Sequence, residues 1–296
     1  TSIFGHPVDL DRLAALQART PAMPVIQDCA HAFICEWQGR EVHRAGVAAI
    51  FGLNVSKTMT SIFGGMVTTD DDALAARLVE FRRRNIAPAS RAHQMKRIAY
   101  ALAVLPAFWP PLFGLTDRLR RMGLLDRFTR YYSDDVIDMP ADHLTELTDF
   151  EARIGLGQVS CLRDLIASRR RYDAFYRREI RASPALAWIE RADGSSVSHS
   201  AARVANKTVV RAAAAARGIE LGEVIEYSVP DMPAYSSYLK DGQSFPVSAA
   251  LARSVINLPT ANLFNQAKAE RVVRAMQEVL ADQAPVPPLP ASGAAP

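Results

Sequence analysis

Residues 24–70 read PVIQDCAHAFICEWQGREVHRAGVAAIFGLNVSKTMTSIFGGMVTTD. Three apolar runs of strand length are found within them: Pro24–Ile26, Val47–Leu53 and Gly65–Thr69. The first run leads into Asp28, as a buried parallel strand does at its carboxyl end. Helices are predicted on both sides, over Asp9–Arg19 and Asp70–Arg84. Strands that alternate with helices indicate an α/β layer with a largely parallel sheet.

The same residues include the side chains with the clearest chemistry. His31 follows Asp28 by three residues, and Ser56-Lys57 comes just after the second strand. A lysine there lies where α/β folds place ligands, and a desolvated lysine has a lowered pKa and can form a Schiff base. A nearby acid such as Asp28 could hold a pyridinium nitrogen protonated, as pyridoxal phosphate requires. From the residues alone, the alternative is that Lys57 is a surface lysine and Asp28 an acid in a capped loop.

Other classes of protein lack a motif in this sequence. The 15 glycines form no Walker A loop, and Gly155-Leu156-Gly157 lacks the third glycine of a dinucleotide fingerprint. There is no GxSxG elbow, and the six histidines show no metal-ligand spacing. Three cysteines without a CxxC pair indicate a reducing compartment and no structural zinc site. A net charge of +4, and arginine runs without interleaved aromatic residues, do not indicate a nucleic-acid partner.

Residues 86–145 differ in character, and we expect a helical, apolar insertion there. Residues 98–115 carry no charge, but Pro106, Pro110 and Pro111 interrupt them, so a membrane-spanning helix is not expected. Basic residues flank this run, which leaves contact with a membrane surface open. The simpler alternative is an insertion that packs on its own protein or on a partner subunit.

The rest of the chain is predicted to be mainly helical. Three helices are expected, over Thr148–Ile180, Ala201–Arg217 and Ala267–Ala281. Gly218 occupies the capping position after the second of them. Five prolines at the C-terminal end indicate an extended, disordered tail.

Three motifs resemble the core of the DegT/DnrJ/EryC1/StrS family of pyridoxal-phosphate sugar aminotransferases. That family reads approximately V-I-E-D-x-A-Q/H-A, F-S-F-x-x-S/T-K and G-G-x-x-x-T, and this chain reads VIQDCAHA at 25–32, FGLNVSK at 51–57 and GGMVTT at 64–69. Three further segments resemble the family. Phe4–Asp9 resembles its F-G-x-P-A-D segment, and Phe150–Gln158 resembles its L-Q-A-A-I-G-L-x-Q-L helix. Ile256–Pro259 and Glu270–Val273 resemble its S-L-P strand and its closing helix. The likeness covers most of residues 1–85 and 145–282.

The resemblance implies a type I pyridoxal-phosphate-dependent aminotransferase fold. This is an α/β fold with a mainly parallel sheet flanked by helices and a smaller α+β C-terminal domain. We expect four regions: part of the large cofactor-binding domain at 1–85, the helical, apolar insertion at 86–145, the C-terminal small domain at 146–283 and the Pro-rich tail at 284–296. The family's G-T-x-A phosphate turn and ring-stacking aromatic would precede Thr1, so we expect an N-terminally truncated domain.

The resemblance also implies a role for individual residues. Lys57 resembles the lysine that forms the Schiff base and carries the proton. Asp28 resembles the partner of the pyridine nitrogen, and His31 resembles the residue that contacts the ring hydroxyl of the cofactor. Ser56 is expected to bind the cofactor as well. The implied enzyme is a homodimer with composite active sites that moves an amino group, usually from glutamate, to a nucleotide-linked keto sugar. It would act in the cytoplasm, in the biosynthesis of sugars for cell-surface polysaccharides or secondary metabolites.

Two departures from the family pattern motivate an alternative. Gly52 stands where the family usually has a serine that binds the cofactor phosphate, and Leu144 stands in place of an asparagine that reaches the neighbouring subunit. The alternative is a catalytically weak family member that acts as a regulatory binding protein or lies against the inner membrane face through residues 98–115. Lys57 argues against the branch of the family that carries histidine there and performs dehydration.

Overall fold

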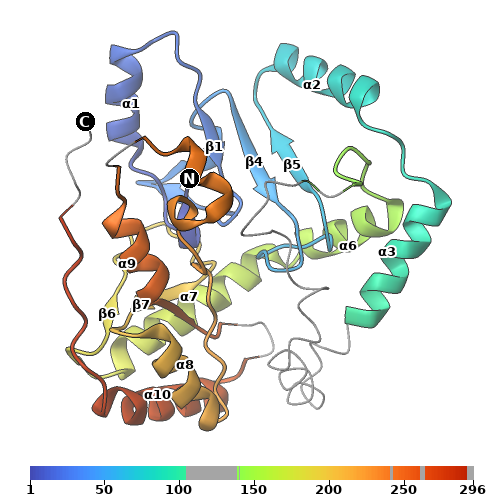
Figure 1. Cartoon of the computed structure of the whole chain (residues 1–296). Helices are drawn as coiled ribbons and strands as arrows, with labels where there is room; N and C mark the ends of the chain where they lie inside the picture. The colour runs from blue at the N-terminus through green and yellow to red at the C-terminus, as the bar shows by residue number, and fades with distance from the viewer. Residues whose placement is uncertain (105–138, 140, 241–242, 261–263, 292–296) are drawn as a thin grey trace.

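The chain folds around two three-stranded β-sheets (Figure 1). The computed structural model describes residues 1–104, 139, 141–240, 243–260 and 264–291. Within these residues the α-helices are α1 (Leu10–Arg19), α2 (Asp72–Asn85), α3 (Arg91–Val104), α6 (Asp149–Val159), α7 (Leu162–Glu179), α8 (Lys207–Ala216), α9 (Pro246–Ser254) and α10 (Gln266–Ala281). Short 3-10 helices are η1 (Ile3–Gly5), η2 (Val42–Arg44), η5 (Val229–Asp231) and η6 (Pro233–Tyr238).

The first sheet has the strand order β1-β4-β5. β1 (Ile26–Asp28) and β4 (Ala48–Gly52) are parallel, as the sequence predicts, and β5 (Gly65–Thr68) is antiparallel to β4. β5 reverses direction because the loop after β4 folds back on itself, where Leu53 N donates to Gly64 O over 2.9 Å. A hairpin of β2 (Glu36–Trp37) and β3 (Arg40–Glu41) lies in the connection between β1 and β4.

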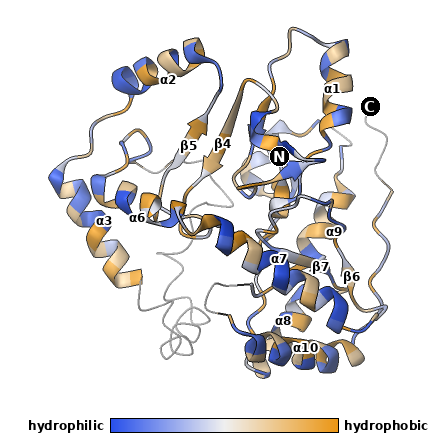
Figure 2. Cartoon of the chain, turned by 180° about the vertical axis from the view of Figure 1, so that it is seen from behind, coloured by the Kyte–Doolittle hydropathy of each residue, from blue (hydrophilic) through white to orange (hydrophobic). Residues whose placement is uncertain are grey.

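One face of this sheet packs against a helix from the second half of the chain. Ala49 and Phe51 of β4 are buried in a cluster with Cys29, Phe33 and Ile166, and Ile166 belongs to α7. Figure 2 shows β4 and β5 as largely hydrophobic strands. The contact with α7 fixes the carboxyl ends of β1 and β4 relative to the rest of the molecule.

The second sheet has the order β6-β7-β8 and is antiparallel throughout. Its strands are β6 (Ala187–Trp188), β7 (Ser200–Arg203) and β8 (Val255–Leu258). Residues of α7, α8 and α10 form a core against it, with Tyr176 and Met276 fully buried. The helices around it show hydrophobic and hydrophilic stretches side by side, as amphipathic helices on a core do (Figure 2).

A buried carboxylate joins α7 to β7. Asp173 is fully buried, and it accepts a hydrogen bond from Ser200 Oγ over 2.7 Å. Its other oxygen forms ion pairs with Arg177 at 2.9 Å and with Arg191 at 3.2 Å. Two arginines and a hydroxyl thus satisfy a charge that would be costly to bury alone. This network holds the beginning of β7, and with it the preceding residue His199, against α7.

Two of the helix predictions need correction. Helix is observed at both ends of Thr148–Ile180, but it breaks at Ser160–Cys161 into α6 and α7. The helix expected at Ala201 is wrong in its first part, because residues 200–203 form β7. The helix begins at Lys207, where the side chain of Asn206 caps it. Alanine favours helices, but pairing on both sides with β6 and β8 overrides that local preference.

The segment expected to be an insertion is closed at its base. Ala87 N donates to Leu144 O over 2.8 Å, and Glu146 N donates to Ala87 O over 2.9 Å. α3 lies within this segment, whereas most of the uncharged run 98–115 lies outside the described residues. Among the described residues, no helix combines the length and apolar character needed to cross a membrane.

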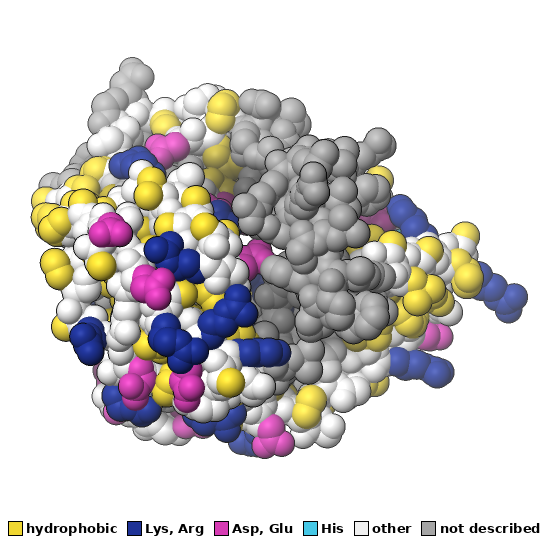
Figure 3. All heavy atoms as spheres, turned by 90° about the horizontal axis from the view of Figure 1, so that it is seen from below, with side chains coloured by type: hydrophobic (Ala, Val, Ile, Leu, Met, Phe, Trp, Pro, Cys, Tyr) yellow, Lys and Arg dark blue, Asp and Glu magenta, His cyan; other side chains and the backbone are white. Residues whose placement is uncertain are grey.

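Part of the proline-rich tail contacts the second half of the chain. Val286 N donates to Pro184 O over 2.7 Å, and Pro287 O accepts from Arg203 Nη2 over 2.6 Å. Residues 292–296 lie outside the described part of the chain. Viewed from below, acidic side chains lie close to the basic side chains of the described residues (Figure 3).

Candidate active site

The candidate site lies at the carboxyl ends of β1 and β4. Asp28 is the last residue of β1, and Gly52 is the last residue of the adjacent strand β4. Asp28 Oδ1 accepts from the backbone N of Ala30 over 3.0 Å, and its Oδ2 accepts from Thr1 Oγ1 over 3.2 Å. These bonds fix the carboxylate at the strand end, where the edge of an α/β sheet binds ligands.

Lys57 reaches back to this edge from the loop that follows β4. Its backbone N donates to Asn54 O over 3.0 Å, and its side chain passes over Gly52. A Cβ added at Gly52 would lie 3.1 Å from Lys57 Cε and 3.5 Å from Ala30 Cβ. Burial lowers the pKa of Lys57 from its ordinary value, and the negative charge of Asp28 partly offsets this. The site therefore favours the neutral amine more than water does.

His31 adds a second nitrogen base to the same site. Its Nδ1 is buried and has no hydrogen-bond partner among the described residues. Burial, and then the positive charge of Lys57, lower the pKa of His31 to about 4, while Asp28 acts in the opposite sense. His31 is therefore neutral near pH 7, with a ring nitrogen left free for a ligand.

Two further residues belong to this cluster and were not found from the sequence. The ring of His199 lies 5.0 Å from the ring of His31, centroid to centroid, and its Nδ1 is 2.9 Å from Ser198 Oγ. Arg169 Nη1 donates to Ser198 O over 2.7 Å, while the buried Nε of Arg169 has no partner among the described residues. The pKa of His199 is lowered to about 3, mainly by burial.

The sequence carried little signal for these two residues. His199 lies 168 positions after His31, and the segment that follows it was assigned to a helix. Recognition of β7 would have placed His199 at the start of a strand. Arg169 belongs to one of the arginine runs that no feature of the sequence placed in a site, whereas burial lowers its pKa.

The structure thus brings together three of the four predicted site residues. Asp28, His31 and Lys57 act on one another electrostatically. Ser56 is exposed, and its hydroxyl donates to Asn54 Oδ1 over 2.7 Å within its own loop. Its role toward a cofactor stays a prediction. Among the described residues, no group of three or more His, Cys, Asp or Glu side chains could hold a metal ion.

The lowered pKa values of His31 and His199 predict a pH dependence of stability. Their pKa values of about 4 and about 3 lie below the ordinary value of about 6.5. At a pH between these values and 6.5, the folded chain therefore binds fewer protons than the unfolded chain. Their contribution to the free energy of unfolding is therefore complete above pH 6.5 and decreases as the pH falls toward 4. Urea titrations at pH 7, 5.5 and 4.5 measure this loss. The double variant His31→Gln/His199→Gln should lose less stability over that range, and an equal loss would contradict the account.

Comparison with known proteins gives the family to which this chain belongs. The model of the DegT/DnrJ/EryC1/StrS aminotransferase family matches residues 1–277, and the chain belongs to this family. The chain is 26% identical to GDP-perosamine synthase of Escherichia coli O157:H7 over 265 residues, which are 87% of this chain and 58% of that protein. A shorter match, 40% identical over 74 residues, is to a UDP-4-amino-4-deoxy-L-arabinose–oxoglutarate aminotransferase of Shewanella sediminis (25% of this chain, 19% of that protein).

A solved structure gives the fold. The chain resembles the PMP form of a putative sugar aminotransferase from Streptococcus pneumoniae with a TM-score of 0.67 and 17% identity, over 95% of this chain and 68% of that one. The expected type I aminotransferase fold is confirmed by this likeness. The chain spans less than two thirds of the length of the curated relatives it matches.

Proposed function

We propose that this site holds pyridoxal phosphate and that the protein is a sugar aminotransferase. The observation that carries the proposal is a half-buried lysine beside a carboxylate at the ends of adjacent strands, with a free histidine nitrogen next to them. These groups fit the cofactor, which needs an amine for its carbonyl, an acid for its ring nitrogen and a partner for its ring hydroxyl. When bound, pyridoxal phosphate supplies the electron sink for amino transfer.

Each residue has a task that follows from its surroundings. Lys57 would provide the amine that binds the cofactor covalently, and its lowered pKa lets its nitrogen accept and return a proton. Asp28 would hold the proton of the ring nitrogen, because a carboxylate favours the charged form of a nearby base. His31 is neutral, so it would hydrogen-bond the ring hydroxyl without adding a positive charge.

The substrates are proposed from the names of the relatives. GDP-perosamine synthase and the UDP-sugar–oxoglutarate aminotransferase both carry a nucleotide in their names, and the second name also contains oxoglutarate, the keto acid that corresponds to glutamate. We therefore propose transfer from glutamate to a nucleotide-linked keto sugar, in polysaccharide or secondary-metabolite sugar biosynthesis. A cytoplasmic homodimer remains part of the proposal. The presence of the half-buried Lys57 beside Asp28 does not favour a catalytically weak binding protein.

The proposal retains the expected division of the chain. Residues 1–85 would belong to the cofactor-binding domain, 86–145 would form the insertion, and 146–283 would form the small domain ahead of the tail at 284–296. Gly52 leaves the space that the Lys57 stem occupies, so a serine there would crowd that stem. At Leu144 the backbone O pairs with Ala87, and its apolar side chain cannot supply the amide of the family's asparagine.

The two half-reactions of amino transfer, measured one after the other, test this function. Glutamate added to the protein loaded with pyridoxal phosphate should change the absorption spectrum of the bound cofactor and release 2-oxoglutarate. A nucleotide-linked keto hexose added next should restore the spectrum and gain an amino group, detected by mass spectrometry. The corresponding free keto sugar is the control and should react far more slowly. Failure of glutamate and of other amino acids to change the spectrum would refute the proposed transfer.

A further inference from the structure

The loop that carries Lys57 is closed on itself at both ends. Leu53 N donates to Gly64 O over 2.9 Å, and Ser61 N donates to Leu53 O over 2.8 Å. Thr60 Oγ1 also donates to Leu53 O, over 3.1 Å, and accepts from Ile62 N over 2.8 Å. Residues 53–64 therefore form one closed loop, and the position of Lys57 depends on what holds that loop.

Gln158 of α6 binds the backbone of this loop on both sides of one residue. Its Oε1 accepts from Thr60 N over 3.2 Å, and its Nε2 donates to Thr60 O over 2.6 Å. One turn earlier on α6, Gly155 lies against the loop, since a Cβ added there would be 3.5 Å from Ser61 Cβ. The amide of Gln158 offers both the donor and the acceptor that this pair of bonds requires.

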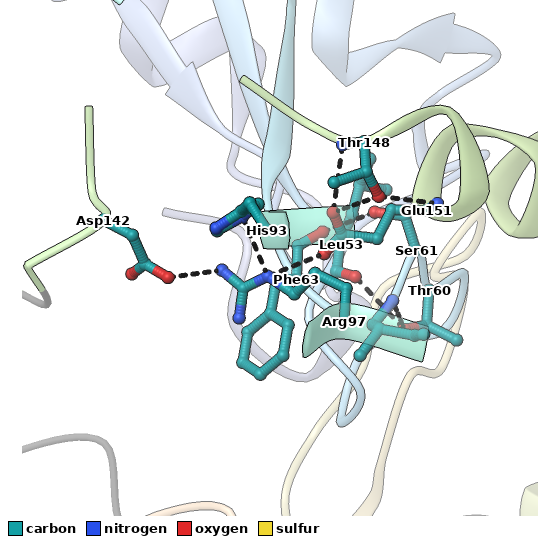
Figure 4. A network of polar contacts seen from close by, with 10 residues as sticks. Leu53, Thr60, Ser61, Phe63, His93, Arg97, Asp142, Thr148 and Glu151 are labelled. Atoms are coloured by element: carbon teal, nitrogen blue, oxygen red, sulfur yellow. Dashed lines mark hydrogen bonds and ion pairs between the residues drawn. The ribbon is translucent and has the colours of Figure 1, made fainter. Parts of the chain in front are cut away.

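α6 is itself fixed in place by a network that includes the same loop (Figure 4). Thr148 and Glu151 form a capping box at the start of α6, and Glu151 is almost completely buried. Arg97 Nε lies 3.4 Å from Glu151 Oε1, and Arg97 Nη2 lies 3.0 Å from Asp142 Oδ2. The Arg97 guanidinium also covers the ring of Phe63 in the loop, 4.1 Å from its centroid. The helix and the loop thus share one rigid support.

We propose that Gln158 is a positioning residue, which holds the Lys57 loop so that the lysine side chain stays over Gly52 and beside Asp28. The inference rests on the proposed function of Lys57 and names a residue that does not itself touch the reacting atoms. Gln158 binds Thr60, which follows Lys57 by three residues in the same loop. Without its two bonds, the loop can shift away from the strand end, and the lysine amine becomes more hydrated.

The pKa of the Lys57 amine depends directly on the position of the loop. Among the described residues, Asp28 acts electrostatically on Lys57, and Lys57 acts on His31 and His199. Burial lowers the pKa of Lys57, so movement into water should raise the pKa toward its ordinary value. A purely structural role of Gln158 would reduce stability without changing this titration.

Competitive labelling of lysines with acetic anhydride across a pH series measures the effect in the protein without added cofactor. Lys57 is the single lysine in residues 1–95, so arginine-specific cleavage isolates it in the peptide 45–77. Gln158→Met keeps the size of the side chain and removes both polar groups. We expect the labelling midpoint of Lys57 to rise by about one pH unit, which equals a tenfold smaller fraction of neutral amine at pH 7.

Gln277→Met is the matched control. Gln277 Nε2 donates to Glu179 O over 2.9 Å, also between residues 98 positions apart, but Gln277 lies on α10, which packs against the second sheet. This variant should leave the titration of Lys57 unchanged. An equal midpoint in Gln158→Met and the parent protein, or an equal shift in Gln277→Met, would overturn the proposal.

Two additions complete the test. If Gln158→Met does not fold, Gln158→Asn keeps the amide but shortens its reach, and it should raise the midpoint in the same direction. An unshifted midpoint in that variant would count against the proposal. Pyridoxal phosphate is added in a separate experiment, so failure of the parent protein to bind it would refute the proposed function, whereas the labelling result judges Gln158 on its own.

Discussion

Lys57→Ala is expected to abolish covalent binding of pyridoxal phosphate and nearly all amino transfer. The variant loses the amine that binds the cofactor and the group that carries the proton. Removing a positioned acid-base group alone costs about 100- to 10,000-fold in rate, and the lost covalent link adds to this. Absorption spectra after addition of the cofactor, and turnover of glutamate with a nucleotide-linked keto sugar, measure both effects.

Lys96→Ala is the control for this variant. Lys96 is exposed on α3, outside the site, and its loss should change neither the spectrum nor the rate. Lys57→Ala should also remain folded, because Lys57 makes no hydrogen bond or ion pair through its side chain among the described residues. A cofactor absorption band in Lys57→Ala equal to that of the parent would rule out Lys57 as the attachment point.

Asp28→Asn is expected to retain the bound cofactor and lose most of the turnover. Asparagine can still accept from Ala30 N at the end of β1, so the local structure is preserved. It carries no charge, and the ring nitrogen of the cofactor would no longer be held in its protonated form. Loss of such an electrostatic contact costs about 100- to 1,000-fold in rate. The measurement is kcat beside the dissociation constant of pyridoxal phosphate.

The two quantities separate catalysis from binding in Asp28→Asn. A fall in kcat with a nearly unchanged dissociation constant supports the assigned role. Asp11→Asn is a matched control, since Asp11 is an exposed acid that pairs with Arg40 and Trp37 away from the site. Unchanged kcat in Asp28→Asn would show that the carboxylate does not act on the ring nitrogen.

Local sequence was sufficient for the strands that carry the predicted site residues. Asp28 ends an apolar run, and Lys57 follows the next run, so their meeting at one sheet edge could be expected from strand pairing alone. α1, α2 and α10 agree with the predicted ranges within two residues, because their caps and apolar spacing are local signals. The antiparallel direction of β5 was not predicted, since it depends on the closure of the 53–64 loop.

The contributions of the second half of the chain depend on tertiary structure. Gln158 lies 98 residues from Thr60, and its helical spacing gives no indication that it binds the Lys57 loop. His199 reaches the site because β7 forms between two strands, in a segment whose alanines favour a helix. Gln158 ends a motif that resembles the family's, but that motif does not show which segment the side chain binds, and His199 lies in no such motif. Their contacts with the site therefore required the tertiary structure.

The attachment of pyridoxal phosphate to Lys57 is the central claim, and reduction with borohydride tests it most directly. The protein is incubated with pyridoxal phosphate, reduced, cleaved at arginine and analysed by mass spectrometry. The peptide 45–77, in which Lys57 is the single lysine, should carry the added mass of one phosphopyridoxyl group. The same peptide should be unmodified in Lys57→Ala. An unmodified 45–77 peptide from the parent protein, with the label on Lys96, Lys207, Lys240 or Lys268 instead, would contradict the account.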